Sequence, residues 1–173
     1  TYSLAGTDAA LFDINGETGK VTFKSSPNYE LPTDVGSGNV YDITVVATDT
    51  AGNASQKSVT VTVTDVNDNG PVFDSGDMGS VAEDALTGTV IYDASTTDAD
   101  GTAANRGVVY SLKAATGDVD LLNINSETGA VTLKDSANYE AKSSYTFTVL
   151  ATNGDLVAEQ PVTVTVTDVN EAP

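Results

Sequence analysis

The sequence predicts an all-β chain made of two tandem Greek-key β-sandwiches. Two observations lead to this prediction. Short segments alternate β-branched or aromatic residues with polar ones, and a set of sequence blocks occurs twice in the same order. Helical spacing of apolar residues is not sustained anywhere in the 173 residues. Short strands separated by turns rich in Gly, Asn, Asp and Ser, about seven in a unit of roughly 100 residues, are typical of antiparallel sandwiches.

The strand pattern is clearest in two segments of each half of the chain. Residues 41–48 and 145–152 alternate apolar side chains mostly with Asp or Thr, and residues 59–64 and 162–167 alternate Val with Thr. Successive side chains of a strand point to opposite faces, so one face of each segment is expected to lie in the core. Tyr41 and Tyr145 are in phase with the apolar residues and are predicted to be core residues.

Five sequence blocks recur in order and divide the chain into two homologous units. Residues 2–4, 14–19, 28–30, 41–49 and 59–67 match residues 110–112, 124–129, 138–140, 145–153 and 162–170, respectively. Gly70-Pro71 marks the start of the second unit, because proline cannot continue a strand ladder. The predicted domains are therefore residues 1–69 and residues 70–173.

The first unit has no counterpart of the residues that precede the first matching block of the second unit. Some forty residues, 70–109, come before Tyr110, whereas Tyr2 follows a single residue. The first unit is therefore expected to lack its N-terminal strand in this fragment. An unpaired edge of this kind favours pairing with another chain or low local stability.

The amino-acid composition favours the binding of hard metal ions over other functions. The formal net charge is −18, from 25 acidic and 7 basic residues. Nucleic acids and anionic membranes bind basic surfaces, so neither nucleic-acid binding nor direct membrane insertion is expected. The chain has no His and no Cys, which removes the usual ligands of zinc, copper and iron and most nucleophiles and general bases.

The abundant carboxylates could instead serve a glycosidase. Such a site needs a cleft with sugar-stacking aromatics and one acid whose pKa is raised by an apolar pocket. The chain has no Trp, and its acids lie in predicted loops beside other acids. We therefore expect no enzymatic activity.

One acidic cluster follows the last strand pattern of each unit. Residues 65–69 read Asp-Val-Asn-Asp-Asn, and residues 168–171 read Asp-Val-Asn-Glu. Taken alone, either run could be a polar linker with Asx turns. Because the acidic run recurs after two homologous strands, we favour a metal-binding site at the hinge between repeated units. Crowded carboxylates repel each other unless a hard cation such as calcium neutralises them.

The ordered motifs resemble those of the cadherin repeat family along essentially the whole chain. Residues 65–73 are similar to the family's inter-repeat DxNDNxPxF signature, and residues 97–101 resemble its DxD segment. Asn28-Tyr29-Glu30 stands where cadherins carry DRE or DYE. The Thr, Ala, Asp and Gly bias looks like the bacterial-type cadherin domains of large surface adhesins.

The resemblance implies a calcium cluster at the junction of the two repeats. The implied ligands are carboxylates, amide side chains and backbone carbonyls, supplied by Glu30, Asp65, Val66, Asn67, Asp68, Asn69, Asp98, Asp100, Asn105 and Asn153. Asn28 and Asn153 stand where the family usually has acids. Five carboxylates balance two ions (+4 against −5) or three (+6 against −5), so two or three calcium ions are expected.

A partial second metal site is implied at the far end of the second unit. Its expected ligands are Glu83, Glu140, Asp168, Asn170 and Glu171. Its partner repeat would follow residue 173, so this copy is expected to bind calcium weakly in the fragment.

The function implied by the resemblance is a calcium-binding extracellular or cell-surface module that rigidifies a tandem-repeat rod and supports cell adhesion. The expected partners are calcium and neighbouring repeats of the same chain, with glycans or another copy of the chain as further partners. The alternative function is a calcium-dependent carbohydrate-binding module. Exposed Tyr or Phe side chains near the loop ends would favour that alternative.

Overall fold

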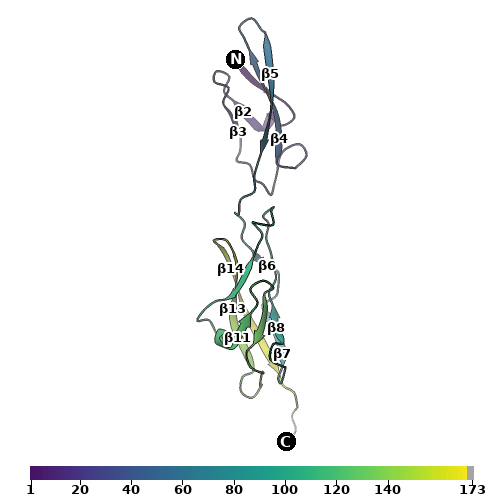
Figure 1. The fold of residues 1–173 in the computed structure, drawn as a ribbon, viewed down its shortest axis with the longest axis vertical. Coiled ribbons are helices and arrows are strands. Elements are labelled where there is room, and N and C mark those ends of the chain that lie inside the picture. The colour runs from purple at the N-terminus through teal and green to yellow at the C-terminus, as the bar shows by residue number, and fades with distance from the viewer. Residues whose placement is uncertain (171–173) are drawn as a thin grey trace. The chain divides into compact units, whose positions relative to one another are not determined.

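The computed structural model describes residues 1–170 and is all-β apart from two short 3-10 turns. The chain divides into two compact units, Thr1–Val66 and Asn67–Pro173. The sequence placed the boundary three residues later, after Asn69. Figure 1 shows the strands of each unit along the chain. The predicted fold class is thus confirmed as all-β.

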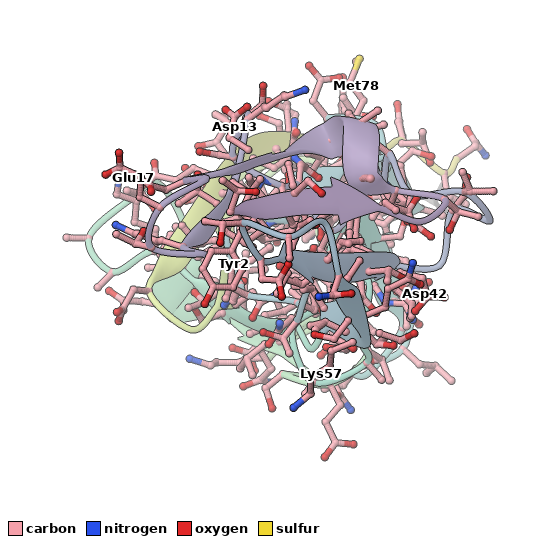
Figure 2. The ribbon with its side chains drawn as sticks, turned by 90° about the horizontal axis from the view of Figure 1, so that it is seen from above. Tyr2, Asp13, Glu17, Asp42, Lys57 and Met78 are labelled. Carbon is pink, nitrogen blue, oxygen red and sulfur yellow. The ribbon has the colours of Figure 1, made fainter. Side chains whose placement is uncertain are left out.

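The first unit consists of a three-stranded sheet and a separate hairpin. Strands β1 (Tyr2–Ala5), β4 (Val40–Thr48) and β5 (Ala54–Thr62) form the antiparallel sheet in the order β1-β4-β5. The 3-10 turn η1 (Ala9–Leu11) leads into β2 (Phe12–Ile14), which pairs with β3 (Val21–Phe23). Exposed side chains such as Asp13, Asp42 and Lys57 cover its outer surface (Figure 2).

The core of the first unit is small and aromatic. Phe12, Tyr41 and Ile43 are its buried residues. The rings of Phe12 and Phe23 lie 4.3 Å apart, and Tyr41 meets Phe23 edge to face at 5.2 Å. The prediction that Tyr41 is a core residue is confirmed, since its exposure is 1%.

The second unit contains the remaining elements. They are β6 (Val72–Phe73), β7 (Met78–Ala82), β8 (Val90–Asp93), β9 (Thr96–Thr97), β10 (Val109–Leu112), η2 (Val119–Leu121), β11 (Leu122–Ile124), β12 (Ala130–Leu133), β13 (Ser144–Asn153) and β14 (Leu156–Thr167). The sheets have the orders β10-β13-β14-β7, β11-β12-β8 and β6-β9. Alternate residues of β13, from Tyr145 to Ala151, face one continuous core, as the sequence pattern predicted.

The two units share several strand pairings but differ at two sheet edges. Strand β1 pairs with β4 and β4 with β5, as β10 pairs with β13 and β13 with β14. In the second unit β7 adds to β14 in parallel and β8 adds to β12. Within residues 1–66 no strand occupies either of these two positions.

Candidate metal centre

The candidate ligands fall into two groups, one in each unit. Glu30, Asp65 and Val66 belong to the first unit, and the other seven predicted ligands of the junction belong to the second. The carboxylates of both groups lie in loops that follow strands, where they can approach one another without disturbing a strand ladder, and Asn153 is the last residue of β13.

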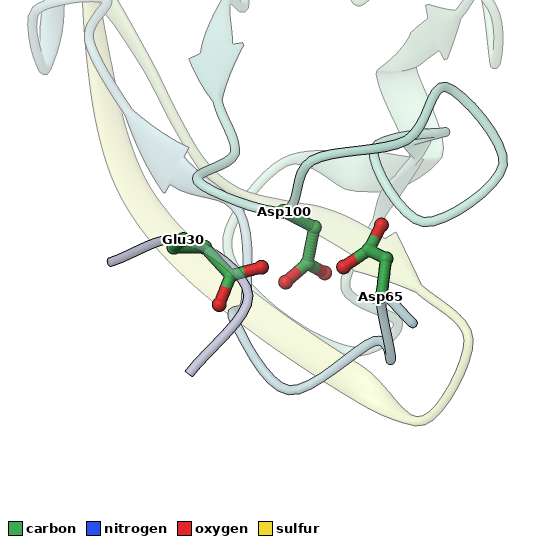
Figure 3. Close-up of side chains that lie close together, drawn as sticks. All are labelled: Glu30, Asp65 and Asp100. Atoms are coloured by element: carbon green, nitrogen blue, oxygen red, sulfur yellow. The ribbon is translucent and has the colours of Figure 1, made fainter. Parts of the chain in front are cut away.

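In the first unit, Glu30 and Asp65 approach each other. Figure 3 shows the two side chains. Their carboxylate oxygens lie within 4.8 Å of each other, and both side chains are half-buried. The backbone N–H groups of Glu30 and Leu31 donate to Oδ1 of Asn28 at 2.7 and 2.9 Å. Asn28 therefore forms an Asx turn that positions Glu30, a role that the sequence analysis missed. The same Asn-x-Glu pattern at residues 138–140 was the available signal.

Among the described residues of the second unit, Asp100 is the most buried acid. It lies on the loop after β9 (Figure 3), and its side chain is nearly inaccessible, with an exposure of 1%. Its Oδ1 accepts hydrogen bonds from the backbone N–H of Asn69 at 3.1 Å and from the Asn69 amide at 2.8 Å. Its Oδ2 is buried without a hydrogen-bond partner. A buried anionic oxygen of this kind is stable only beside a positive charge, which makes Asp100 a good metal ligand.

Asp98 and Asn153 join the loop after β9 to the end of β13. Oδ1 of Asp98 accepts from the backbone N–H of Asp100 at 3.0 Å, and its Oδ2 accepts from the amide Nδ2 of Asn153 at 2.9 Å. That amide also donates to the backbone carbonyl of Asn105. Asn67 donates to Oδ1 of Asn153 at 3.1 Å. Hydrogen bonds thus link all seven ligand residues predicted for the second unit, although Asp68 is exposed and is joined to the others through the Asn69 amide.

The far end of the second unit carries the second predicted group. Carboxylate oxygens of Glu83, Glu140 and Asp168 all lie within 4.8 Å of one another. Glu83 is 3% exposed, and the backbone N–H groups of Val169 and Tyr139 donate to its carboxylate at 2.6 and 2.9 Å.

The hydrogen bonds from Val169 and Tyr139 lower the pKa of Glu83 below its ordinary value, so this carboxylate is charged at neutral pH. Asn170 is exposed. Glu171 lies outside the described residues.

The predicted junction ligands and the far-end group both fit calcium by their donor chemistry. Their side-chain donors are carboxylate and amide oxygens, and neither His nor Cys occurs in the chain. Calcium takes roughly six to eight oxygen ligands in flexible geometry, so loops that combine acids, amides and carbonyls suit it. Over residues 1–170 the helices are two three-residue 3-10 turns, and neither is long enough to cross a membrane.

Comparison with known proteins identifies the family. Residues 78–167 match the family model of the cadherin domain. The chain belongs to the cadherin family. The whole chain is also similar to solved cadherin structures, such as mouse cadherin-23 EC22-24, with a TM-score of 0.80 and 29% identity over 98% of this chain and 54% of that one.

The curated relatives are much longer proteins. Human protocadherin Fat 4 is 36% identical over 88% of this chain, and human protocadherin Fat 1 is 34% identical over all of it. The Drosophila protein dachsous is 34% identical over 99% of the chain. The matched segments make up only 3% to 5% of these three relatives.

The comparisons bear on several predictions. The cadherin resemblance is confirmed, and the expected extracellular or cell-surface location agrees with the protocadherin relatives. The similar protocadherin gamma B2 structure is described as one of extracellular cadherin domains. The relatives are cadherins rather than enzymes. Those named here are animal proteins, so the bacterial-type style stays a sequence-based prediction, and nothing in them supports carbohydrate binding. The protocadherin gammaB7 structure, 27% identical, is described as a cis-dimer.

Proposed function

We propose that this cadherin chain is a calcium-binding extracellular module, in which two or three calcium ions held by acids of both units stiffen the joint of a tandem-repeat rod and so support adhesion. The observation that carries the proposal is Asp100. It is 1% exposed, and its Oδ2 has no hydrogen-bond partner. A divalent cation gives this oxygen the positive partner that it lacks.

The chain supplies carboxylates from three separate segments. Glu30 and Asp65 would come from the first unit, Asp68 from the linker, and Asp98 and Asp100 from the loop after β9. Neutral oxygens would complete the shell, from the backbone carbonyls of Val66, Asn69 and Asn105 and the side chains of Asn67 and Asn153. When bound, calcium supplies a positive charge that these oxygens share.

The stiffening follows from electrostatics. Five carboxylates without a cation repel one another and favour open, mobile loops. A shared cation reverses the sign of this interaction and links the loops of one unit to those of the next. Each site filled at about ten times its dissociation constant adds roughly 1.4 kcal/mol to the folded state.

The variant Asp100→Asn tests the site. It preserves the shape of the side chain and an acceptor for Asn69 but removes the charge. We expect calcium to raise the melting temperature of the wild-type chain and to leave that of the variant nearly unchanged. The control Asp120→Asn removes an exposed acid on η2 and should respond like wild type. Equal calcium-induced shifts in wild type and Asp100→Asn would refute the ligand assignment.

We also propose that Glu83, Glu140 and Asp168, with Asn170 and Glu171, bind calcium weakly. Three acids within 4.8 Å support this second site. In isothermal titration of Asp100→Asn, a weak binding phase should survive after the junction phase is lost. A titration with no remaining heat would show that the far-end group does not bind calcium in this chain.

A further inference from the structure

Asn153 is an amide at a position that faces the core of the second unit. It is the last residue of β13 and lies in phase with the buried residues Val149 and Ala151. Its own exposure is 3%. A buried polar side chain on a core-facing position is costly unless its donors and acceptor are satisfied. The hydrogen-bond partners of Asn153 therefore determine what it does.

The Asn153 side chain links three segments that are far apart in the sequence. Its Nδ2 donates to Oδ2 of Asp98 at 2.9 Å and to the backbone carbonyl of Asn105. Its Oδ1 accepts from the amide of Asn67 at 3.1 Å, and its backbone carbonyl accepts from the same amide at 3.3 Å. One side chain thus ties the end of β13 to the linker, to the loop after β9 and to the segment before β10.

The two acceptors of the Asn153 NH₂ group are both oxygens that the ligand set above assigns to calcium. One is an anionic carboxylate oxygen and the other is a carbonyl oxygen, so their convergence on one point needs a positive or donor group between them. The amide NH₂ carries two N–H donors and satisfies both. A carboxylate at position 153 would instead add a second negative charge beside Asp98.

We propose that the amide of Asn153 takes the place of a cation in this part of the junction. The linker and the loops around Asp98 and Asn105 are then held together without calcium, and an ion binding here must displace a hydrogen-bonded NH₂ group. For Asn153 to act as a ligand, its amide has to turn so that Oδ1, in place of the NH₂ group, faces an ion bound beside Asp98. The calcium side of this inference rests on the proposed function, but the metal-free cross-link does not.

The variant Asn153→Asp separates the two states. In chelator it should lower the melting temperature of the second unit, because it removes two donors and adds a charge beside Asp98; a loss of roughly 1 kcal/mol corresponds to about 4–8 °C in a unit of this size. In calcium it should gain roughly tenfold in affinity for the weakest-bound junction ion, because the new carboxylate is a charged ligand. Calorimetric melting and isothermal titration measure both effects.

Two further variants keep the test informative. Asn153→Ala removes the cross-link without adding a ligand, so it should lose stability in chelator and gain no calcium affinity. Asn123→Asp adds the same charge at an exposed position on β11 and should match wild type in both conditions. If Asn153→Asp melts like wild type in chelator, or if Asn123→Asp reproduces its effects, the inference is overturned.

A direct readout does not depend on the variants folding. In the nitrogen-15 spectrum of the wild-type chain in chelator, the Asn153 side-chain NH₂ should exchange slowly with solvent, and calcium titration should shift it. A rapidly exchanging NH₂ in chelator would contradict the cross-link. A protected NH₂ together with no calcium response anywhere in the chain would support the cross-link and refute the proposed function.

Discussion

Two matched acids, Asp8 and Asp118, anchor the turn before a 3-10 element to the neighbouring strand in each unit. Asp8 is 2% exposed and accepts from the backbone N–H groups of Asp42 at 2.7 Å and Val35 at 2.8 Å. Asp118 accepts from the N–H of Thr146 at 2.8 Å and pairs with Lys142 at 2.8 Å. In both repeats the acid accepts a hydrogen bond from a backbone N–H of the neighbouring strand. Its second partner differs: the backbone N–H of Val35 for Asp8, and the Lys142 side chain for Asp118.

The pKa of Asp118 makes this contact sensitive to acid. Burial alone raises the pKa of Asp118, but the hydrogen bonds from Lys142 and Thr146 outweigh it and hold the pKa below the ordinary value of 3.8. A carboxyl whose pKa is depressed in the folded state contributes stability at neutral pH. That contribution is complete above the ordinary value and is lost as the pH falls through the lowered pKa.

We therefore expect Asp118→Asn to lower the free energy of unfolding at pH 7 by about 1–3 kcal/mol, since it removes a charged acceptor. The difference from wild type should shrink as the pH falls below 3.8. Chemical denaturation at several pH values in chelator measures it. Asp120→Asn, on an exposed acid nearby, should show no such pH dependence. A difference that grows toward low pH would contradict the role given to Asp118.

At the scale of elements, the parallel pairing of β7 with β14 depends on a glycine. Gly79 pairs with Val164, and a Cβ atom built on Gly79 would lie 2.5 Å from the backbone carbonyl oxygen of Ile91 in β8. Real Cβ atoms do not approach a backbone oxygen so closely, so a larger residue has to push β7 away from β8. Glycine at this position lets one strand lie beside β14 and close to β8.

The variant Gly79→Ala should therefore destabilise the second unit by about 1–3 kcal/mol through overpacking. Gly76→Ala is a matched control, because a Cβ at Gly76 would meet nothing within 4 Å. Hydrogen exchange of the β7 and β14 amides should locate the damage at this sheet edge. Equal stability of the two variants would show that β7 can move away from β8 at little cost.

The sequence predicted some elements well and others not at all. Strands β4, β5, β13 and β14 show a regular two-residue alternation, which fixes both their existence and their inward face. The parallel strand β7 was not predicted, because its paired residues in β14 lie 85 positions away in sequence and its exposed Met78 breaks the pattern. The two 3-10 turns are too short to leave a periodic signal.

The ligand types could be read from the sequence, but their hydrogen-bond partners could not. The repeated Asp-x-Asn run and the DxD segment pointed to the right loops. The Asn67 contact to Asn153 depends on folded geometry, because it joins residues 86 positions apart. Alternating patterns report which face a residue occupies and carry no information on such distant polar contacts.

For the whole molecule, we expect calcium to restrict the motion of the two units relative to each other. The most direct measurement is small-angle scattering of the chain in calcium and in chelator, with Asp100→Asn as the comparison. We predict a narrower distribution of interatomic distances for the wild-type chain in calcium, and chelator-like profiles for the variant in both conditions. Identical wild-type profiles with and without calcium would contradict this expectation.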